Sequence, residues 1–214
     1  MPFRHAITRV DDLRNRYWPA SEGVLRKQID HLDEGARGFI ARSPFVVVAT
    51  FNERGADASP RGGPAGFVRV LDDKRLAVGD LAGNNRLDTF ANVIEHAAVG
   101  MLFLIPGMDE TLRVNGRGTI TVDPDVLAAT TVDGKTPRVA LGIDVQECFI
   151  HCAKAFRRGG MWDPASWLDA GARPSAAAIL REHLCIEAEA AVIEADLEEG
   201  YAITMWETGG RPDA

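Results

Sequence analysis

The sequence predicts a fold that is mainly β, with helices on both flanks of the sheet (an α+β fold). Two observations support this. Residues 45–151 hold about six short β-rich segments separated by turn residues, whereas residues 8–42 and 152–214 repeat apolar residues at helical spacing. Helices and strands do not alternate, which argues against a parallel doubly wound sheet. Short strands at regular spacing favour a small barrel, and 214 residues suffice for one domain with a core.

Residues 8–42 are expected to form two helices. The first begins at Thr8, whose hydroxyl can cap it, and ends at the Trp18-Pro19 pair. The second begins at Ser21 and ends before Pro44. Its apolar stripe consists of Leu25, Ile29, Leu32, Ala36 and Phe39.

The central region is expected to hold the strands and one inserted helix over residues 85–96. Strands are expected at residues 45–51, 75–79, 99–105, 111–122 and 138–150, and residues 57–59 and 66–71 are candidates for extended segments. Asn115-Gly116 fits either a hairpin turn or a bulge within one long strand. The bulge is favoured, because a turn would leave two very short strands.

Short helices are expected elsewhere. One begins at Asp123-Pro124, and three more cover residues 153–158, 175–186 and 187–199. The expected organisation is therefore an N-terminal helical extension (residues 1–42), a central β domain (residues 43–162) and a C-terminal helical extension (residues 163–214).

Composition excludes several classes of protein. The 31 acidic and 24 basic residues give a net charge of −7, which argues against a protein that grips nucleic acid. No apolar run approaches the roughly 18 residues that span a bilayer, and the N-terminus lacks an apolar signal segment, so a cytoplasmic protein is expected. Three cysteines make a disulfide framework improbable, and we expect reduced thiols.

Two loops offer hydrogen-bond donors to an anion. Ser59-Pro60-Arg61-Gly62-Gly63 combines a hydroxyl, a guanidinium and glycines that expose backbone amides, a set that suits phosphate. A proline-glycine turn with a solvated Arg is the plainer alternative. Gly83–Asp88 precedes the inserted helix, whose N-terminus attracts anions, and Arg86 carries the wrong charge for helix stability alone. Asn capping with an exposed Arg is the alternative there.

Two further segments carry polar groups. Arg113, Asn115 and Arg117 would share one face of a strand, which is either a binding face or simply exposed. Cys148, His151 and Cys152 suggest zinc, but no second Cys/His pair with the spacing of zinc ligands exists to complete four ligands, so no metal site is expected. We expect both cysteines to be small buried residues. Lys154 and Trp162 follow, as a basic helix start and an aromatic side chain that can stack or fill the core.

No Walker, GxGxxG, HExxH or GxSxG motif occurs where its chemistry requires it, and no catalytic residue can be named.

Three blocks in order resemble the pyridoxamine 5′-phosphate oxidase-related flavin-binding proteins. They read DASPRGGPAGFVRVLDDKRLAVGDLAGNNRLDTFANV, VGMLFLIPGMDETLRVNGRGTI and VQECFIHCAKAFRRGGMW, between about Arg42 and Trp162. The resemblance implies a split β-barrel homodimer with FMN bound at the dimer interface. It assigns cofactor contacts to Ser59, Pro60, Arg61, Asp80, Asn85, Arg86, Arg113, Lys154 and Trp162.

Within that set, the resemblance places Ser59, Pro60 and Arg61 along the ring or ribityl chain and Asp80 at the ring edge. It places the phosphate at Asn85 and Arg86. The chain lacks the C-terminal Arg and His pair that binds substrate in the true oxidases, so vitamin B6 oxidation is not implied.

The function expected on this basis is FMN-dependent oxidation or reduction of a small molecule, with NADH or NADPH as a possible electron donor. Alternatives of the same fold are a flavin- or haem-binding storage protein, with His151 as the haem candidate, and a deazaflavin-dependent reductase. No nucleic acid or membrane partner is expected.

Overall fold

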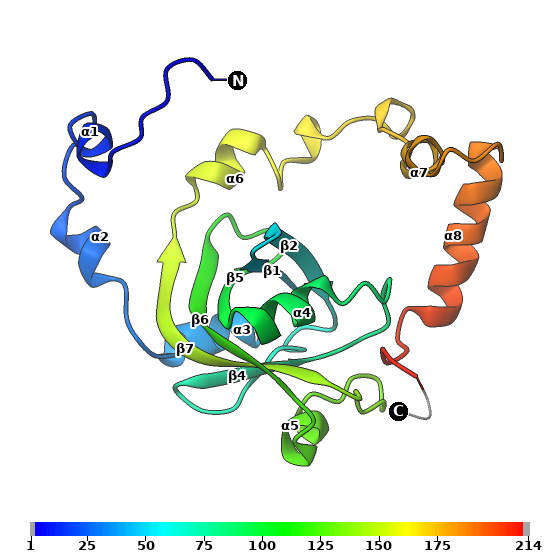
Figure 1. The fold of residues 1–214 in the computed structure, drawn as a ribbon, viewed down its shortest axis with the longest axis horizontal. Helices are drawn as coiled ribbons and strands as arrows, with labels where there is room; N and C mark the ends of the chain where they lie inside the picture. Colours follow the sequence, from blue (N-terminus) through cyan, green and yellow to red (C-terminus); the bar gives the residue numbers. More distant parts are fainter. Residues whose placement is uncertain (1–2, 212–214) are drawn as a thin grey trace.

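A computed structural model describes residues 3–211 and is built around one antiparallel sheet of seven strands (Figure 1). The strand order is β2-β1-β5-β6-β7-β4-β3. The strands are β1 (Phe45–Asn52), β2 (Gly55–Gly62), β3 (Arg69–Val70), β4 (Arg75–Gly79), β5 (Ala98–Leu104), β6 (Thr111–Thr121) and β7 (Ala140–His151). Within the described residues the outermost strands, β2 and β3, do not pair with each other, so hydrogen bonds do not close the sheet. The predicted class, mainly β with flanking helices, is confirmed.

The helices lie around this sheet. They are α1 (Val10–Arg14), α2 (Glu22–Arg26), α3 (Glu34–Ile40), α4 (Asp88–Glu95), α5 (Pro124–Ala129), α6 (Lys154–Gly159), α7 (Ala176–Leu184) and α8 (Ala190–Thr204). Two short 3₁₀ turns, Pro164–Ser166 and Ala170–Ala172, separate α6 from α7. Among residues 3–211, no helix is long and apolar enough to cross a membrane.

The N-terminal helices differ from the prediction. Thr8 does not cap α1, whose N-cap is Arg9 without a side-chain hydrogen bond. The expected single helix after Ser21 is split into α2 and α3, because Ile29 exchanges backbone hydrogen bonds of 3.0 and 2.7 Å with Cys148 on β7. The Asp33 carboxylate accepts a hydrogen bond of 2.8 Å from the Ala36 amide and so restarts the helix as α3.

The core lies between the concave side of the sheet and the helices α3 and α4. Val46 on β1 and Phe103 on β5 are fully buried, and Leu32 and Ile40 close the same cluster from the N-terminal segment. Val93 of α4 packs beside Val99, close to the Cα of Gly118 on β6. This packing fixes α4 against the sheet, and with it the loop that leads into α4.

The bulge in β6 is confirmed. The strand pairs with β7 along its whole length, and the register shifts between Asn115 and Gly116. At the shift Gly116 approaches β7 so closely that a Cβ atom would overlap the carbonyl oxygen of Asp144. A residue without a side chain is therefore required at the point where the pairing register of the two longest strands shifts.

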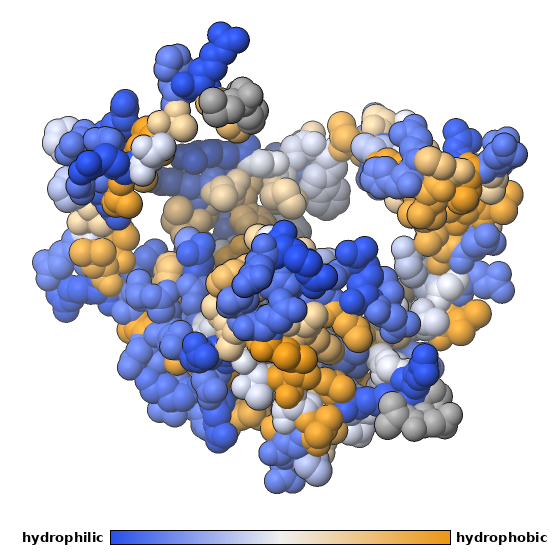
Figure 2. Space-filling model, in the orientation of Figure 1, coloured by the Kyte–Doolittle hydropathy of each residue, from blue (hydrophilic) through white to orange (hydrophobic). Residues whose placement is uncertain are grey.

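The C-terminal segment leaves the sheet after α6 and forms an arm around one side of the molecule (Figure 1). Helix α8 packs mainly against α7, and the space-filling view shows the arm standing apart from the core over much of its length (Figure 2). Tyr201 and Ile203 of α8 are exposed. The arm rejoins the sheet just beyond α8, where Thr208 forms a bridge with Leu81.

Replacing Gly116 with Ala should destabilise the fold. The added methyl group would meet backbone, which cannot move without breaking the β6–β7 ladder, so we expect a loss of about 1–3 kcal/mol in the free energy of unfolding. Urea denaturation measures it. Gly142→Ala on β7 is the matched control, because its Cβ would have only ordinary contacts. Equal stability of the two variants would contradict this account of the bulge.

Candidate functional site

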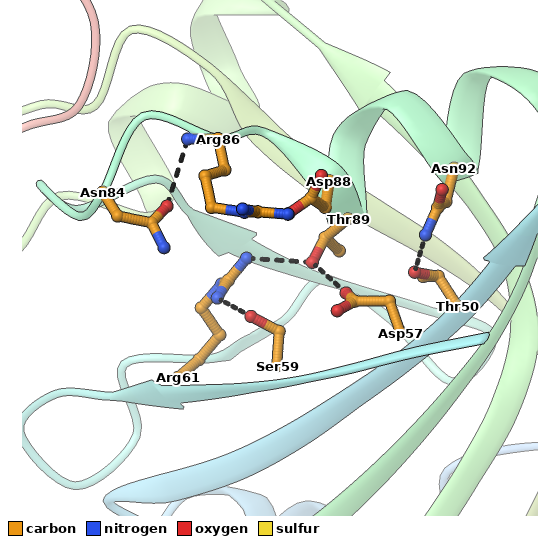
Figure 3. A network of polar contacts seen from close by, with 9 residues as sticks. All are labelled: Thr50, Asp57, Ser59, Arg61, Asn84, Arg86, Asp88, Thr89 and Asn92. Carbon is orange, nitrogen blue, oxygen red and sulfur yellow. Dashed lines mark hydrogen bonds and ion pairs between the residues drawn. The ribbon is translucent and has the colours of Figure 1, made fainter. Parts of the chain in front are cut away.

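Strand β2 presents alternate side chains to the side of the sheet where α4 begins. Asp57, Ser59 and Arg61 are half-buried, whereas their neighbours are exposed, as the two-residue period of a strand requires. The Arg61 guanidinium donates to the Ser59 hydroxyl at 2.6 Å (Figure 3). It also donates to the Pro60 carbonyl at 3.0 Å. These bonds fold the side chain back along its own strand.

Thr89 in the first turn of α4 connects this strand to the helix. Its hydroxyl accepts a hydrogen bond of 3.2 Å from Arg61 and donates one of 3.1 Å to the Asp57 carboxylate. A second bond, from the Asn92 amide to the Thr50 hydroxyl at 3.0 Å, ties α4 to β1 (Figure 3). Neither Thr89 nor Asp57 was expected from the sequence. Asp57 could have been, because it lies two and four residues before Ser59 and Arg61 and so shares their face of the strand.

The loop from Gly83 to Leu87 has an unusual backbone. Asn85 and Leu87 both take left-handed conformations, with φ of 54° and 59°. The Asn84 side chain accepts a hydrogen bond of 3.0 Å from the Arg86 amide and stabilises the turn. Helix α4 therefore begins at Asp88, three residues later than the sequence predicted, with Leu87 as an N-cap that provides no side-chain hydrogen bond.

Arg86 lies on the outside of this loop. Its Nε atom donates to Asp88 at 2.6 Å, and the side chain is exposed. The Asp88 carboxylate beside it raises the pKa of the Arg86 guanidinium. Arg86 lines a neighbouring groove together with Asp57 and Asn92. It is thus a fixed positive charge at the start of α4.

These segments enclose one cleft of about 350 Å³. Its walls are formed by β2, by the end of β4 with the residues that follow it, and by the loop before α4. Five of the nine predicted cofactor contacts line it, namely Ser59, Pro60, Arg61, Asp80 and Asn85. Its apolar lining comes from Phe67, Val78, Leu81, Leu87 and Met205.

Asp80 is a half-buried carboxyl at the end of β4. Burial raises its pKa, and the positive charge of Arg61 acts in the opposite direction. A carboxyl in this environment is more easily protonated than one in water. Among residues 3–211, the charged side chains that line the cleft are therefore one fixed cation, Arg61, and one acid, Asp80, whose ionisation is disfavoured.

The remaining predicted residues lie elsewhere. Arg113 on β6 stacks on the Phe149 ring, with 5.4 Å between the guanidinium carbon and the ring centroid. Trp162 donates to the Met108 carbonyl at 2.8 Å and stacks on Phe156, while Lys154 is exposed at the start of α6. None of Arg113, Lys154 and Trp162 lines the cleft of this chain.

The Cys-His-Cys group is not one cluster. Cys148 is buried, which raises the pKa of its thiol to about 11, but Cys152 is exposed, so the prediction that both are buried was wrong for Cys152. Burial lowers the pKa of His151, and its Nε2 atom is buried without a hydrogen-bond partner in the described structure. Residues 3–211 contain no group of three or more His, Cys, Asp or Glu side chains arranged to hold a metal ion.

The raised pKa of Asp80 predicts a pH-dependent effect on stability. Folding favours the protonated carboxyl, so its contribution is fully present below the ordinary pKa and is lost as pH rises through the folded-state pKa. The stability of Asp80→Asn relative to the wild type should therefore increase between about pH 3.5 and about pH 7.

Urea denaturation at both pH values measures this difference. Asp196→Asn, at an exposed position of α8, controls for the lost negative charge. A difference that stays constant, or that follows the control, would show that the Asp80 carboxyl is not desolvated.

The chain is similar to several solved structures, all at low sequence identity. Solved structures of similar fold include the HupZ protein of Group A Streptococcus, at 16% identity, TM-score 0.46, and coverage of 55% of this chain and 92% of that one. General Stress Protein 26 from Bacillus anthracis has 13% identity, TM-score 0.41, and coverage of 53% and 88%. A FAD-binding protein from Mesorhizobium loti has 14% identity, TM-score 0.37, and coverage of 53% and 87%.

A search of curated proteins finds no match. A family model described as pyridoxamine 5′-phosphate oxidase matches residues 32–152, which include the sheet and most of the cleft. Since that match covers more than half of the sequence, the chain belongs to the pyridoxamine 5′-phosphate oxidase family.

Proposed function

We propose that this protein binds FMN in the cleft and uses it to oxidise or reduce a small molecule. One observation carries the proposal. Two segments of the chain, Ser59–Gly62 and the stretch from Val78 to Asn85, converge on one cleft with hydrogen-bond donors and apolar walls. FMN has matching parts, namely an apolar planar ring and a phosphate that favours guanidinium groups and free amides.

The residues present fit each part of the cofactor. Arg61 provides positive charge inside the cleft. Arg86, which pairs with Asp88 in the neighbouring groove, provides a second positive charge on the outer side of the loop that leads into α4. Because Leu87 cannot cap the helix, the first amides of α4 have no side-chain acceptor from that position, and they favour an anion. Phe67, Val78 and Leu87 provide apolar surface for the ring. Asn85 and Ser59 offer polar contacts between these ends.

When bound, FMN supplies the electron or hydride transfer itself. The residues of this chain bind and orient the cofactor, and the apolar lining excludes water from one side of it. The proposal includes a small-molecule substrate and NADH or NADPH as the electron donor, and it assigns no catalytic acid or base.

We further propose that two copies of the chain form the complete site. Arg113, Lys154 and Trp162 lie outside the cleft of their own chain, so a second copy is needed if they are to contact the cofactor. The sheet offers a hollow for such a partner, whose lining includes the small residues Ala49, Ala98 and Gly100 as well as the larger Phe51 and Glu147.

Light scattering after size-exclusion chromatography tests this assembly. A particle of about twice the 23.2 kDa of one chain supports the proposal. A monomer at micromolar concentration that still binds FMN would contradict it, because the three distant residues would then have no role at the cofactor.

Arg86→Ala tests the phosphate contact. We expect FMN to bind about tenfold more weakly, because a charge-assisted contact is lost, while riboflavin, which has the ring without the phosphate, keeps its affinity. Flavin fluorescence quenching measures both. Arg75→Ala is the matched control, because the exposed Arg75 pairs with Asp72 through Nε at 2.8 Å, as Arg86 pairs with Asp88.

A parallel loss for FMN and riboflavin, or no loss for either, would contradict the phosphate contact at Arg86. A wild-type protein that binds a phosphorylated deazaflavin but not FMN would favour the deazaflavin alternative.

A further inference from the structure

The C-terminal strap, residues 205–210, lies against the cleft although it is outside the part of the chain that the family model matches. The Glu207 carbonyl accepts a hydrogen bond of 2.7 Å from the Ala82 amide, and Thr208 forms a bridge with Leu81. The Gly209 amide donates to the Asp80 carbonyl at 3.5 Å. The strap therefore adds a short strand-like edge to the residues that follow β4.

Gly209 makes the closest approach in this region. It is buried, and a Cβ atom there would overlap the Asp80 carboxylate. The strap backbone thus lies directly against Asp80, an acidic side chain of the cleft. On its other side, the strap is held by an ion pair between Glu207 and Lys135.

Met205 places a side chain of the strap at the edge of the cleft, where the residue remains 54% exposed. It follows α8 and lines the cleft with Leu87 and Phe67. A thioether is flexible and polarisable, so it packs well against an aromatic ring. It has no charge and no hydrogen-bond donor, so it does not stabilise a phosphate. Figure 1 shows why this contact is notable, since α8 descends from the arm and the chain then turns in beside the loop before α4.

We infer that the C-terminal strap is a binding element of the cleft, in which Met205 forms an apolar wall against the bound ring and Gly209 positions Asp80. The contacts of the strap with the cleft are present in the chain without a ligand. The identity of the ring that Met205 would contact rests on the proposed function. The strap should accordingly affect the ring of a ligand and not its phosphate.

Hydrogen–deuterium exchange of the flavin-free, full-length protein tests the wall. Gly209→Ala should displace the strap and increase the exchange of peptides covering residues 80–83 and 205–211 by about tenfold or more. Gly200→Ala on α8, whose Cβ would meet nothing, is the matched control and should leave them protected. Fast exchange of these peptides in the wild type, or equal exchange in both variants, would overturn the wall.

Flavin titration tests the role of Met205. Met205→Ala should weaken FMN and riboflavin equally, by about three- to tenfold. Ile203→Ala, an exposed residue near the end of α8, should weaken neither. Gly209→Ala should resemble Met205→Ala, and the Met205 variant leaves every backbone anchor in place if Gly209→Ala fails to fold.

Unchanged affinity in Met205→Ala, or a loss for FMN alone, would overturn the role of Met205 while leaving flavin binding intact. If the wild type binds neither flavin, the proposed function fails, the ring contact fails with it, and the exchange experiment alone decides whether the strap forms the wall.

Discussion

The hydrogen bonds of Arg61 hold together the two sides of the cleft. The guanidinium bonds to Ser59 and Pro60 on its own strand and to Thr89 on α4, and Thr89 passes the connection on to Asp57. Strand β2 is an edge strand, paired only with β1 in the described sheet, and an edge strand by itself has no fixed distance from the helix above it. This network sets that distance, and the loop before α4 and the end of β4 close the cleft around it.

Local sequence patterns predicted most of the sheet. Residues 45–51 were recognisable as a buried strand from β-branched residues, and the bulge at Asn115-Gly116 followed from the length of the segments around it. The N-terminal region could not be predicted in the same way. The spacing of Leu25, Ile29 and Leu32 fits a helix, but Ile29 pairs with Cys148 across the fold, and such long-range pairing leaves no mark in a local pattern.

The same limit applies to the site. Ser59, Arg61 and Asn85 stood out because glycine- and proline-rich loops surround them. Thr89 looks like an ordinary residue of a helix, and only the packing of α4 brings it to Arg61. Met205 belongs to a segment without any motif, and it reaches the cleft because Gly209 lets the backbone lie on Asp80. Helix α4 begins at Asp88 and not at the predicted Asn85, because Asn85 and Leu87 take left-handed conformations. The helical spacing of apolar residues does not reveal such conformations.

The roles proposed for the cleft residues depend most on flavin being the ligand of this cleft. The most direct measurement is the visible absorption spectrum of the protein as purified, with the released cofactor identified by its mass. The account predicts bands of an oxidised flavin, the mass of FMN, and about one cofactor per chain. A colourless protein that stays colourless after incubation with excess FMN, and leaves all added FMN free on dialysis, would contradict it.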